Sequence, residues 1–321
     1  MTLAVAAAVA AAIALPHHLP LSRVAPMLGA SIWLFALTLR ALACVFAAMF
    51  VLFSLPATRL FEVLTHWCWH AVLPLVGTHL PLEGHRLGDT ATLLPGLFLA
   101  VSTLSVVWAL MRTAHAVHKM LRRHALAGGP MGSVIVPDGD VLVAAAGLRR
   151  PTVVVSAGAL CAFDDEELAA SVDHERGHIV RHHRFLLVLG EICRTVGRFV
   201  PGAAPALGQL HFHLERDADE YALDQTRNPL ALASAICKAA AGQGAAVPLM
   251  GLHGRSRLTL RLEYLMAGGR QRASDAVEKG ARMLAVVMLS VTLFLAASAP
   301  GVALERGVIL PGLPSAAAWH C

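Results

Sequence analysis

The chain has 321 residues, of which 56% are hydrophobic and 15% are charged, and its mean hydropathy is +0.62. A water-soluble protein cannot usually bury this much apolar surface, so the composition indicates an integral membrane protein. The net charge of +5 is modest, and no basic stripe or aromatic RNA-binding motif accompanies it, so we expect no direct binding of nucleic acid.

The first apolar segment runs from Leu3 to Leu15 and is followed by Pro16. It is short for a membrane-crossing helix, and a cleaved signal peptide is the competing interpretation. A signal peptide normally carries Lys or Arg before its apolar run, and this segment has neither. We therefore expect a retained first transmembrane helix within residues 3–22.

Three further segments are longer than the roughly 20 apolar residues that a helix needs to cross a bilayer. They are residues 27–55, 90–111 and 282–304. The first holds a single charged residue, Arg40, whereas 90–111 and 283–304 hold none. A charge within a membrane helix usually faces other helices, so we expect Arg40 to pack inside the helix bundle.

Basic residues flank the segment between the last two of these spans. They are Arg112, Lys119, Arg122 and Arg123 on one side and Arg270, Arg272, Lys279 and Arg282 on the other. Because basic residues gather on the cytoplasmic side of membranes, we expect residues 113–281 to form a cytoplasmic domain. Residues 1–112 then form a membrane region of about three helices with an outside loop at 56–88, and residues 305–321 form a short outside tail.

Short apolar runs at residues 133–136, 141–147 and 151–156 predict strands at the start of the cytoplasmic part. The sequence PDGD at 137–140 is typical of a turn, so the first two strands are expected to form a hairpin. This part of the chain should therefore contain a small β-sheet. A strand at 141–146 on its edge could bind an extended peptide.

The rest of the cytoplasmic part is expected to be helical. Asp164 followed by Glu167 is a variant of the capping box and predicts the start of a helix. The apolar segment 185–200 is interrupted by three charged residues near one helical face, which predicts an amphipathic helix against the bilayer or the membrane helices. A further helix covers residues 207–223. The expected fold is a mainly α integral membrane protein with about four transmembrane helices and a cytoplasmic α+β domain.

The helix that begins near Asp164 carries His174, Glu175 and His178 in the HExxH arrangement. Histidines four residues apart face the same side of a helix, so both imidazoles can bind one zinc ion. Glu175 lies beside the first histidine and can act as a general base without being a ligand. Gly177 costs about 1 kcal/mol relative to Ala inside a helix, which close packing around the metal would explain.

A catalytic zinc site needs three protein ligands and one open position. Glu215 and Asp219 lie four residues apart on the later helix. We expect Glu215 to be the third ligand and Asp219 to accept a hydrogen bond from a zinc-bound histidine. His211, four residues before Glu215, is the alternative ligand.

Two more histidines, His182 and His183, follow the HExxH motif closely. A straight helix places His182 about 12 Å from His174 along its axis, so one ion cannot easily bind both. Arg181 and Arg184 occupy the positions that the metzincin pattern requires to be Gly and His, which excludes that class. We interpret this stretch as a basic, solvated helix end near lipid headgroups.

HExxH followed by ExxxD resembles the gluzincin membrane peptidases. The resemblance is greatest to the BlaR/MecR-type antirepressor peptidases and less to the HtpX-type and CAAX-processing peptidases. It covers about residues 130–265 by motif and the whole chain by the order of its spans. It implies a cytoplasmic gluzincin-like zinc metalloendopeptidase domain, with Glu175 as the base and Asp219 as the residue that orients a ligand. The implied zinc ligands are His174, His178 and Glu215.

The resemblance implies a protein substrate, such as a cytoplasmic transcriptional repressor or the chain itself, cleaved beside the lipid bilayer. The chain departs from the BlaR/MecR pattern because no penicillin-binding sensor domain follows the last span, so β-lactam sensing is not expected. His253 and Arg261 are the candidates for stabilising the oxyanion, as a later Arg does in HtpX-type relatives. The alternatives are an HtpX-like quality-control peptidase and a non-catalytic membrane signalling or scaffold protein. The sequence predicts no oligomeric state.

Overall fold

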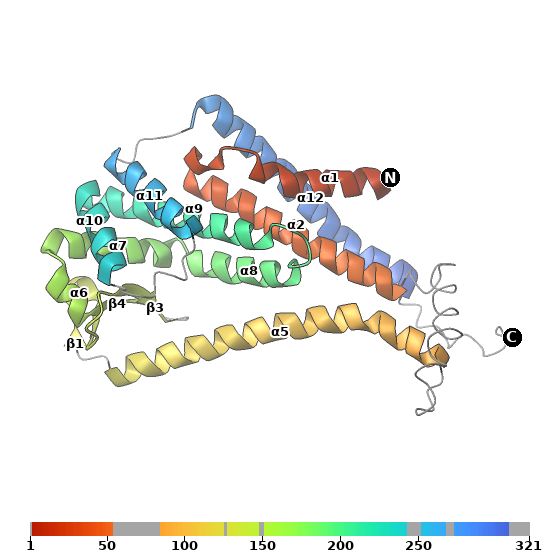
Figure 1. Cartoon of the computed structure of the whole chain (residues 1–321), viewed down its shortest axis with the longest axis horizontal. Coiled ribbons are helices and arrows are strands. Elements are labelled where there is room, and N and C mark those ends of the chain that lie inside the picture. Colours follow the sequence, from red (N-terminus) through yellow and green to blue (C-terminus); the bar gives the residue numbers. More distant parts are fainter. Residues whose placement is uncertain are drawn as a thin grey trace, which may run out of the picture.

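The computed structural model describes residues 2–53, 84–124, 127–147, 151–242, 252–267 and 273–307. Helices dominate these residues, and a small mixed sheet lies at one end of the molecule (Figure 1). The expectation of a mainly α protein with a small β-sheet is confirmed for this part of the chain.

Three helices among the described residues are long and apolar enough to cross a membrane. They are α2 (Pro26–Phe53), α5 (Gly84–His124) and α12 (Asp275–Gly307). Each contains one of the three long apolar segments found in the sequence. Their exposed side chains are largely apolar, as Leu104, Trp108 and Met283 illustrate, and such faces suit contact with lipid.

The first expected span is too short. Helix α1 covers Thr2–Ala14, and a 3₁₀ turn (Leu15–His17) follows it. Pro16 has no N–H group with which to continue the α-helical hydrogen bonds. The 13 residues of α1 rise about 20 Å, which is less than the ~30 Å of a bilayer's hydrocarbon core. The sequence predicted four crossing helices, whereas the part of the chain that the structure describes contains three that are long enough.

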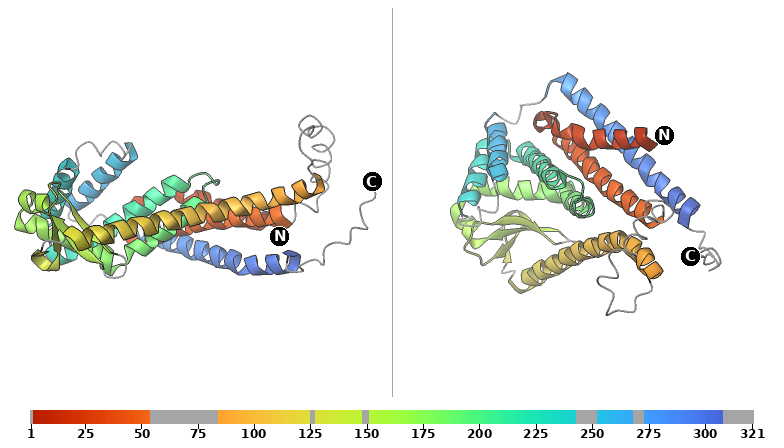
Figure 2. Two further views of the ribbon diagram at one scale, coloured as in Figure 1. Left: turned by 90° about the horizontal axis from the view of Figure 1, so that it is seen from below. Right: turned by 45° about the vertical axis from the view of Figure 1, so that its right-hand side comes forward.

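Helix α2 is the central helix of the molecule. It contacts α1 and α12 on one side, and α5, α8 (His183–Val196) and α9 (Ala203–Thr226) on the others (Figures 1 and 2). The residues buried between these helices include Ile32, Ala36, Leu37, Leu39, Leu210, Leu214 and Met288. Arg40 is also buried, with an exposed fraction of 1%, so the prediction that it packs inside the bundle is confirmed.

Helix α8 confirms the amphipathic helix expected at residues 185–200. It packs against both α2 and α5, while Glu191 and Arg194 pair with each other on its surface. Arg198, just after the helix, stacks over the ring of Phe98 in α5 at 4.3 Å. The charged positions thus pair with each other or contact α5, whereas the apolar positions divide between the bundle and the surface, where Phe185 and Leu189 are exposed.

The sheet contains β1 (Ala127–Gly128), β2 (Val134–Val136), β3 (Val143–Ala146) and β4 (Thr152–Ser156). The described strands have the order β1-β2-β4-β3, with β2 parallel to β4 and β3 antiparallel to it. The hairpin predicted across residues 137–140 is therefore wrong, because β4 lies between the two strands that it would have paired. Strand β3 is at the edge of the sheet, as expected.

Strand β4 takes the inner position because it is apolar on both faces. Val153, Val154 and Val155 are all buried, and a strand covered on both sides is typically a continuous apolar run. Ser156 then secures the loop that replaces the hairpin turn. Its Oγ accepts a hydrogen bond from Leu142 N and donates one to Asp140 O.

Helix α7 (Asp165–Val180) begins where the sequence predicted. Asp164 Oδ1 accepts from the backbone N–H of Glu167 at 2.8 Å, and Glu167 Oε2 accepts from that of Asp164 at 3.0 Å. Lys238 also binds the buried Glu167 carboxylate. Burial by itself would raise the pKa of Glu167, but Lys238, Ser234 and the backbone of Asp164 together lower it.

The remaining described helices complete the end of the molecule that carries the sheet. They are α6 (Ala157–Ala162), α10 (Pro229–Gly242) and α11 (Leu252–Met266). Helix α10 packs on α7, and α11 packs on α10. Most of the predicted outside loop at 56–88 and of the predicted tail at 305–321 lies outside the described residues.

Helix α5 ends beside the sheet, whereas α12 begins at the top of the molecule in Figure 1 and runs toward the end opposite the sheet. From the two basic clusters that flank residues 113–281 in the sequence, we expect a topology reporter fused after Arg123 to report the cytoplasm and one fused after Ser315 to report the outside. The reason is that α12 would carry the chain across the bilayer once between the two fusion points. Reporters that respond from the same side would contradict this layout.

Candidate metal centre

Helices α7 and α9 pack against each other and bring three potential metal ligands together. The Nε2 atoms of His174 and His178 are 3.3 Å apart. Glu215 lies opposite, with Oε1 3.3 Å from His178 Nε2 and Oε2 3.5 Å from His174 Nε2. One ligand atom from each residue lies within 4.8 Å of the others, so this group could hold a single metal ion.

Gly177 allows the two helices to approach this closely. A Cβ atom added to it would lie 3.1 Å from Tyr221 Cβ and 3.2 Å from Ala218 Cα, both on α9. Close packing of α7 against α9 therefore accounts for this glycine, and the expected packing around a metal stays a prediction. The small residue thus sets the separation between the two histidines on α7 and the carboxylate on α9.

Gly177→Ala is expected to push α7 away from α9 and to weaken metal binding by about tenfold or more, because overpacking of this kind costs ~1–3 kcal/mol. The measurement is a zinc titration of purified protein, with thermal unfolding followed in parallel. Gly280→Ala is the matched control, since a Cβ there meets nothing within 4 Å. Equal affinity in the two variants would show that the helix separation is not critical.

Asp219 and Arg261 surround the ligands. Asp219 is fully buried, and its Oδ1 lies 2.9 Å from His174 Nδ1, an ion-pair distance without well-directed hydrogen-bond geometry. Arg261 in α11 donates to both oxygens of Asp219 at 2.8 and 2.9 Å and to Glu215 Oε2 at 2.7 Å. Its guanidinium therefore orients both carboxylates, a positioning role that sequence reasoning did not predict.

These charges determine the protonation of the metal-free site. Burial alone would lower the pKa of His174, but the carboxylates of Asp219 and Glu215 outweigh it and raise this pKa to about 10. Burial likewise opposes ionisation of Glu215, yet Arg261 and the two histidines hold its pKa well below the usual range. Without a bound ion, these contacts favour a protonated His174 between ionised carboxylates near neutral pH.

Metal binding is expected to release about one proton per ion at pH 7.5, because an ion bound to His174 must replace the proton on Nε2. Affinity should accordingly rise with pH until the pH approaches 10. Calorimetric titration with Zn²⁺ in two buffers of different ionisation enthalpy measures the release. Asp219→Asn should reduce the number of protons released, since it removes one of the two carboxylates that raise the pKa of His174. A buffer-independent heat would contradict the prediction.

A second buried chain of polar groups supports His178. Its Nδ1 lies 2.9 Å from Nδ1 of His183, whose Nε2 lies 2.9 Å from Asp217 Oδ2. Arg181 pairs with the same aspartate. Burial would raise the pKa of Asp217, but His183 and Arg181 lower it. Both His174 and His178 thus have a partner at Nδ1, which leaves Nε2 of each facing the centre.

The prediction of a solvated helix end at His182 and His183 is wrong for His183, which is fully buried. Helix α7 ends at Val180, and His182 adopts a left-handed conformation with φ of 55° before α8 begins. The chain therefore turns, and the distance along a straight helix no longer applies. Asp217 was also missed, because only the folded chain brings it to His183.

Glu175 directly follows His174 in α7 and does not belong to the group of potential ligands. Its Oε2 accepts a hydrogen bond of 2.7 Å from the backbone N–H of Ala145 in β3. The carboxylate is therefore held between α7 and the edge of the sheet. His211, the alternative third ligand, is exposed and lies outside the group. The side chain of His253 is outside the described part of α11.

Two imidazole nitrogens and one carboxylate oxygen form the donor set, which suits several divalent transition metals. No protein-family model, curated protein or solved structure matches the chain. His174, His178 and Glu215 fit a metal ion. Asp219 and His183 contact the Nδ1 atoms of the two histidines, and Arg261 pairs with the ionised carboxylate of Glu215.

Proposed function

We propose that this chain is a membrane-embedded zinc metalloendopeptidase that hydrolyses peptide bonds of protein substrates at the cytoplasmic membrane surface. The observation that carries the proposal is the group of His174, His178 and Glu215, with Glu175 next to His174 in α7 but outside the group. Three protein ligands leave a position for substrate, an arrangement typical of catalytic zinc sites. Structural zinc sites usually have four protein ligands.

His174, His178 and Glu215 would hold the ion. Bound zinc supplies Lewis acidity, which polarises a scissile carbonyl and lowers the pKa of water. Asp219 and His183 keep the two imidazoles in the required orientation, because each contacts the ring nitrogen that does not face the centre. The chain itself therefore preorganises the donor atoms.

Glu175 is the proposed general base. It accepts a proton from the attacking water and passes it to the leaving amine. Its contact with Ala145 places it next to the edge strand β3. An extended peptide that pairs with this edge would pass beside the carboxylate, so the same strand can align the substrate.

The resemblance to BlaR/MecR-type peptidases supports a regulatory role, in which the substrate is a cytoplasmic repressor or the chain itself. The experiment is a comparison of proteomes from cells with the wild-type chain and cells with Glu175→Ala at equal expression. Accumulation of one or a few regulators in the variant would support this role. Accumulation of many membrane proteins would indicate quality control instead, and identical proteomes would favour a non-catalytic scaffold.

A further inference from the structure

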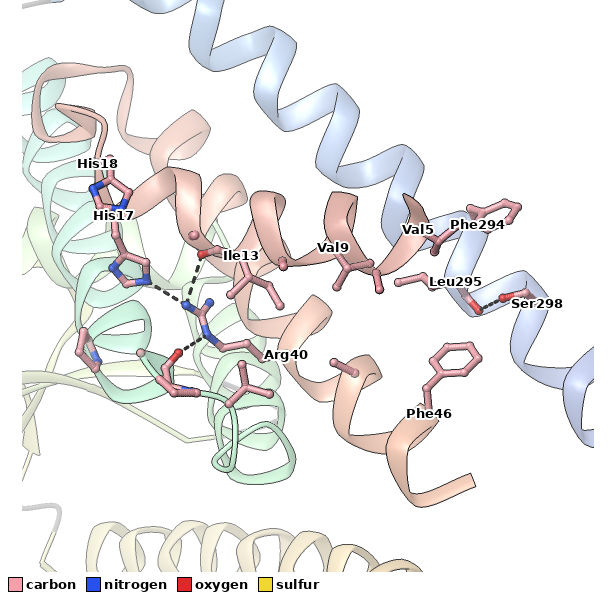
Figure 3. A pocket seen from close by; sticks show the side chains of 18 residues that line it. Val5, Val9, Ile13, His17, His18, Arg40, Phe46, Phe294, Leu295 and Ser298 are labelled. Carbon is pink, nitrogen blue, oxygen red and sulfur yellow. Dashed lines mark hydrogen bonds between the residues drawn. The ribbon is translucent and has the colours of Figure 1, made fainter. Parts of the chain in front are cut away.

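A second feature lies away from the metal centre. An open cavity of about 1060 Å³ is lined by α1, α2, α12 and the turn that joins α8 to α9 (Figure 3). Small-molecule pockets usually measure about 300–1,000 Å³, so the cavity can take a long ligand. Most of its wall is apolar. The apolar side chains include Val5, Val9, Ile13, Phe46, Phe294 and Leu295.

The charged and imidazole groups of the cavity gather at one end, around the buried guanidinium of Arg40, whereas Ser298 lies at the other end and donates to Leu295 O (Figure 3). Arg40 Nε donates to Pro201 O at 3.1 Å, and Nη1 donates to Ala36 O at 2.9 Å. Nη2 lies 3.4 Å from Ile13 O and 2.8 Å from His17 Nε2. All four partners are neutral. Among the residues that the structure describes, Arg40 forms no ion pair with a carboxylate.

His17 extends this cationic end toward the surface. Arginine has only donors, so Nε2 of His17 must accept the hydrogen bond and the ring carries its proton on Nδ1. The His17 side chain is exposed and lines the cavity. Its remaining N–H group is therefore a donor polarised by Arg40. A buried charge without a counter-ion is costly, so this end of the cavity favours an anion.

We propose that the cavity binds a long-chain fatty acid. The carboxylate lies at His17 and Arg40, and the hydrocarbon chain follows α1 and α12 toward Phe294. The positive charge of Arg40 selects an anionic head group, and the apolar wall selects a hydrocarbon tail. Hydrogen bonds between a charged donor and a carboxylate are roughly twice as strong as neutral ones, so the head group contributes substantially to affinity.

The narrow polar end favours a small, flat head group. Gly202 has φ of +87°, and a Cβ there would lie 2.9 Å from Arg40 Nη2 and 3.2 Å from His17 Nε2. Arg40 also lies about 21 Å along α2 from Pro26, near the middle of that helix. A phospholipid keeps its bulky headgroup at the bilayer surface, whereas a fatty acid carboxylate has no such attachment.

The first test measures binding directly and needs no peptidase activity. Full-length protein is delipidated in detergent and labelled with palmitate that carries a photoreactive diazirine on its chain. Saturable labelling of α1 and α12 is expected, with palmitate competing and methyl palmitate not. Equal competition by the ester would overturn the role of the charge. Stronger displacement by phosphatidylglycerol than by palmitate would overturn the choice of a fatty acid.

The second test uses variants of α1. Ala10→Trp fills the cavity and should abolish labelling, whereas Ala8→Trp on the same helix should not, because Ala8 is exposed and does not line the cavity. His17→Ala should lower palmitate affinity by about tenfold or more with little change in thermal unfolding. Arg40 is left intact because it also holds the α8–α9 turn. Unchanged labelling of both Ala10→Trp and His17→Ala would overturn the proposal.

Discussion

Glu175→Gln is expected to reduce peptide hydrolysis by at least ~10²-fold, the low end of what general acid–base catalysis contributes. The amide has nearly the same shape as the carboxylate but cannot accept a proton from water. Any cleavage of the chain by itself should stop as well. The measurement is cleavage of the chain, or of a casein-like test protein, by purified protein in detergent or lipid.

Zinc content must be quantified in the same samples, because Glu175 is outside the group of potential ligands. Its carboxylate accepts a hydrogen bond from Ala145 N–H in β3, which the oxygen of Gln can also accept, so the variant should keep its fold and nearly all of its metal. Loss of cleavage with zinc retained would support a peptidase. If the variant cleaves as fast as the wild type, Glu175 is not the base. Wild-type protein that holds zinc yet cleaves nothing across a broad substrate library would favour the scaffold.

His178→Ala or Glu215→Ala is expected to remove most of the bound zinc, which the wild-type chain should hold at about one ion per molecule. Each substitution removes one of the three donor residues that the described part of the chain brings together. Asp219→Ala should weaken affinity by roughly 10–100-fold, because it leaves the donor set intact but releases the ring of His174. Metal content after dialysis and a competitive zinc titration measure these effects.

His211→Ala is the matched control for the ligand variants, since His211 lies on α9 one turn before Glu215 but is exposed and outside the group. It should bind zinc like the wild type. If Glu215→Ala keeps its zinc while His211→Ala loses it, the assignment of the third ligand is wrong. Thermal unfolding of each variant separates loss of the ligand from loss of the fold.

Several features follow from neighbouring residues and were therefore predictable. The long helices α2, α5 and α12 come from apolar runs interrupted by few charges. The start of α7 comes from Asp164 and Glu167, whose reciprocal hydrogen bonds close within four residues. The spacing of His174 and His178 places both on one helical face, which is a local property of any α-helix.

Other predictions were wrong because a local sequence pattern does not determine how distant segments pack. The length of α1 was overestimated, since Pro16 ends it. The strands were found but their pairing was not, because the strand with two buried faces moved to the inside of the sheet. His183 was misplaced because the straight-helix distance did not allow for the turn at His182.

The sequence by itself determined the apolar helices, the position of the small sheet and the two helical motifs that could bind a metal. Tertiary structure alone decided what surrounds them. Arg261 contacts Glu215 across 46 residues, and Asp217 contacts His183 across 34. Tertiary structure also placed Arg40, which has no carboxylate partner among the described residues, at the end of an apolar cavity. The reason is that helical periodicity is set by adjacent residues, whereas these contacts depend on the packing of helices distant in the chain.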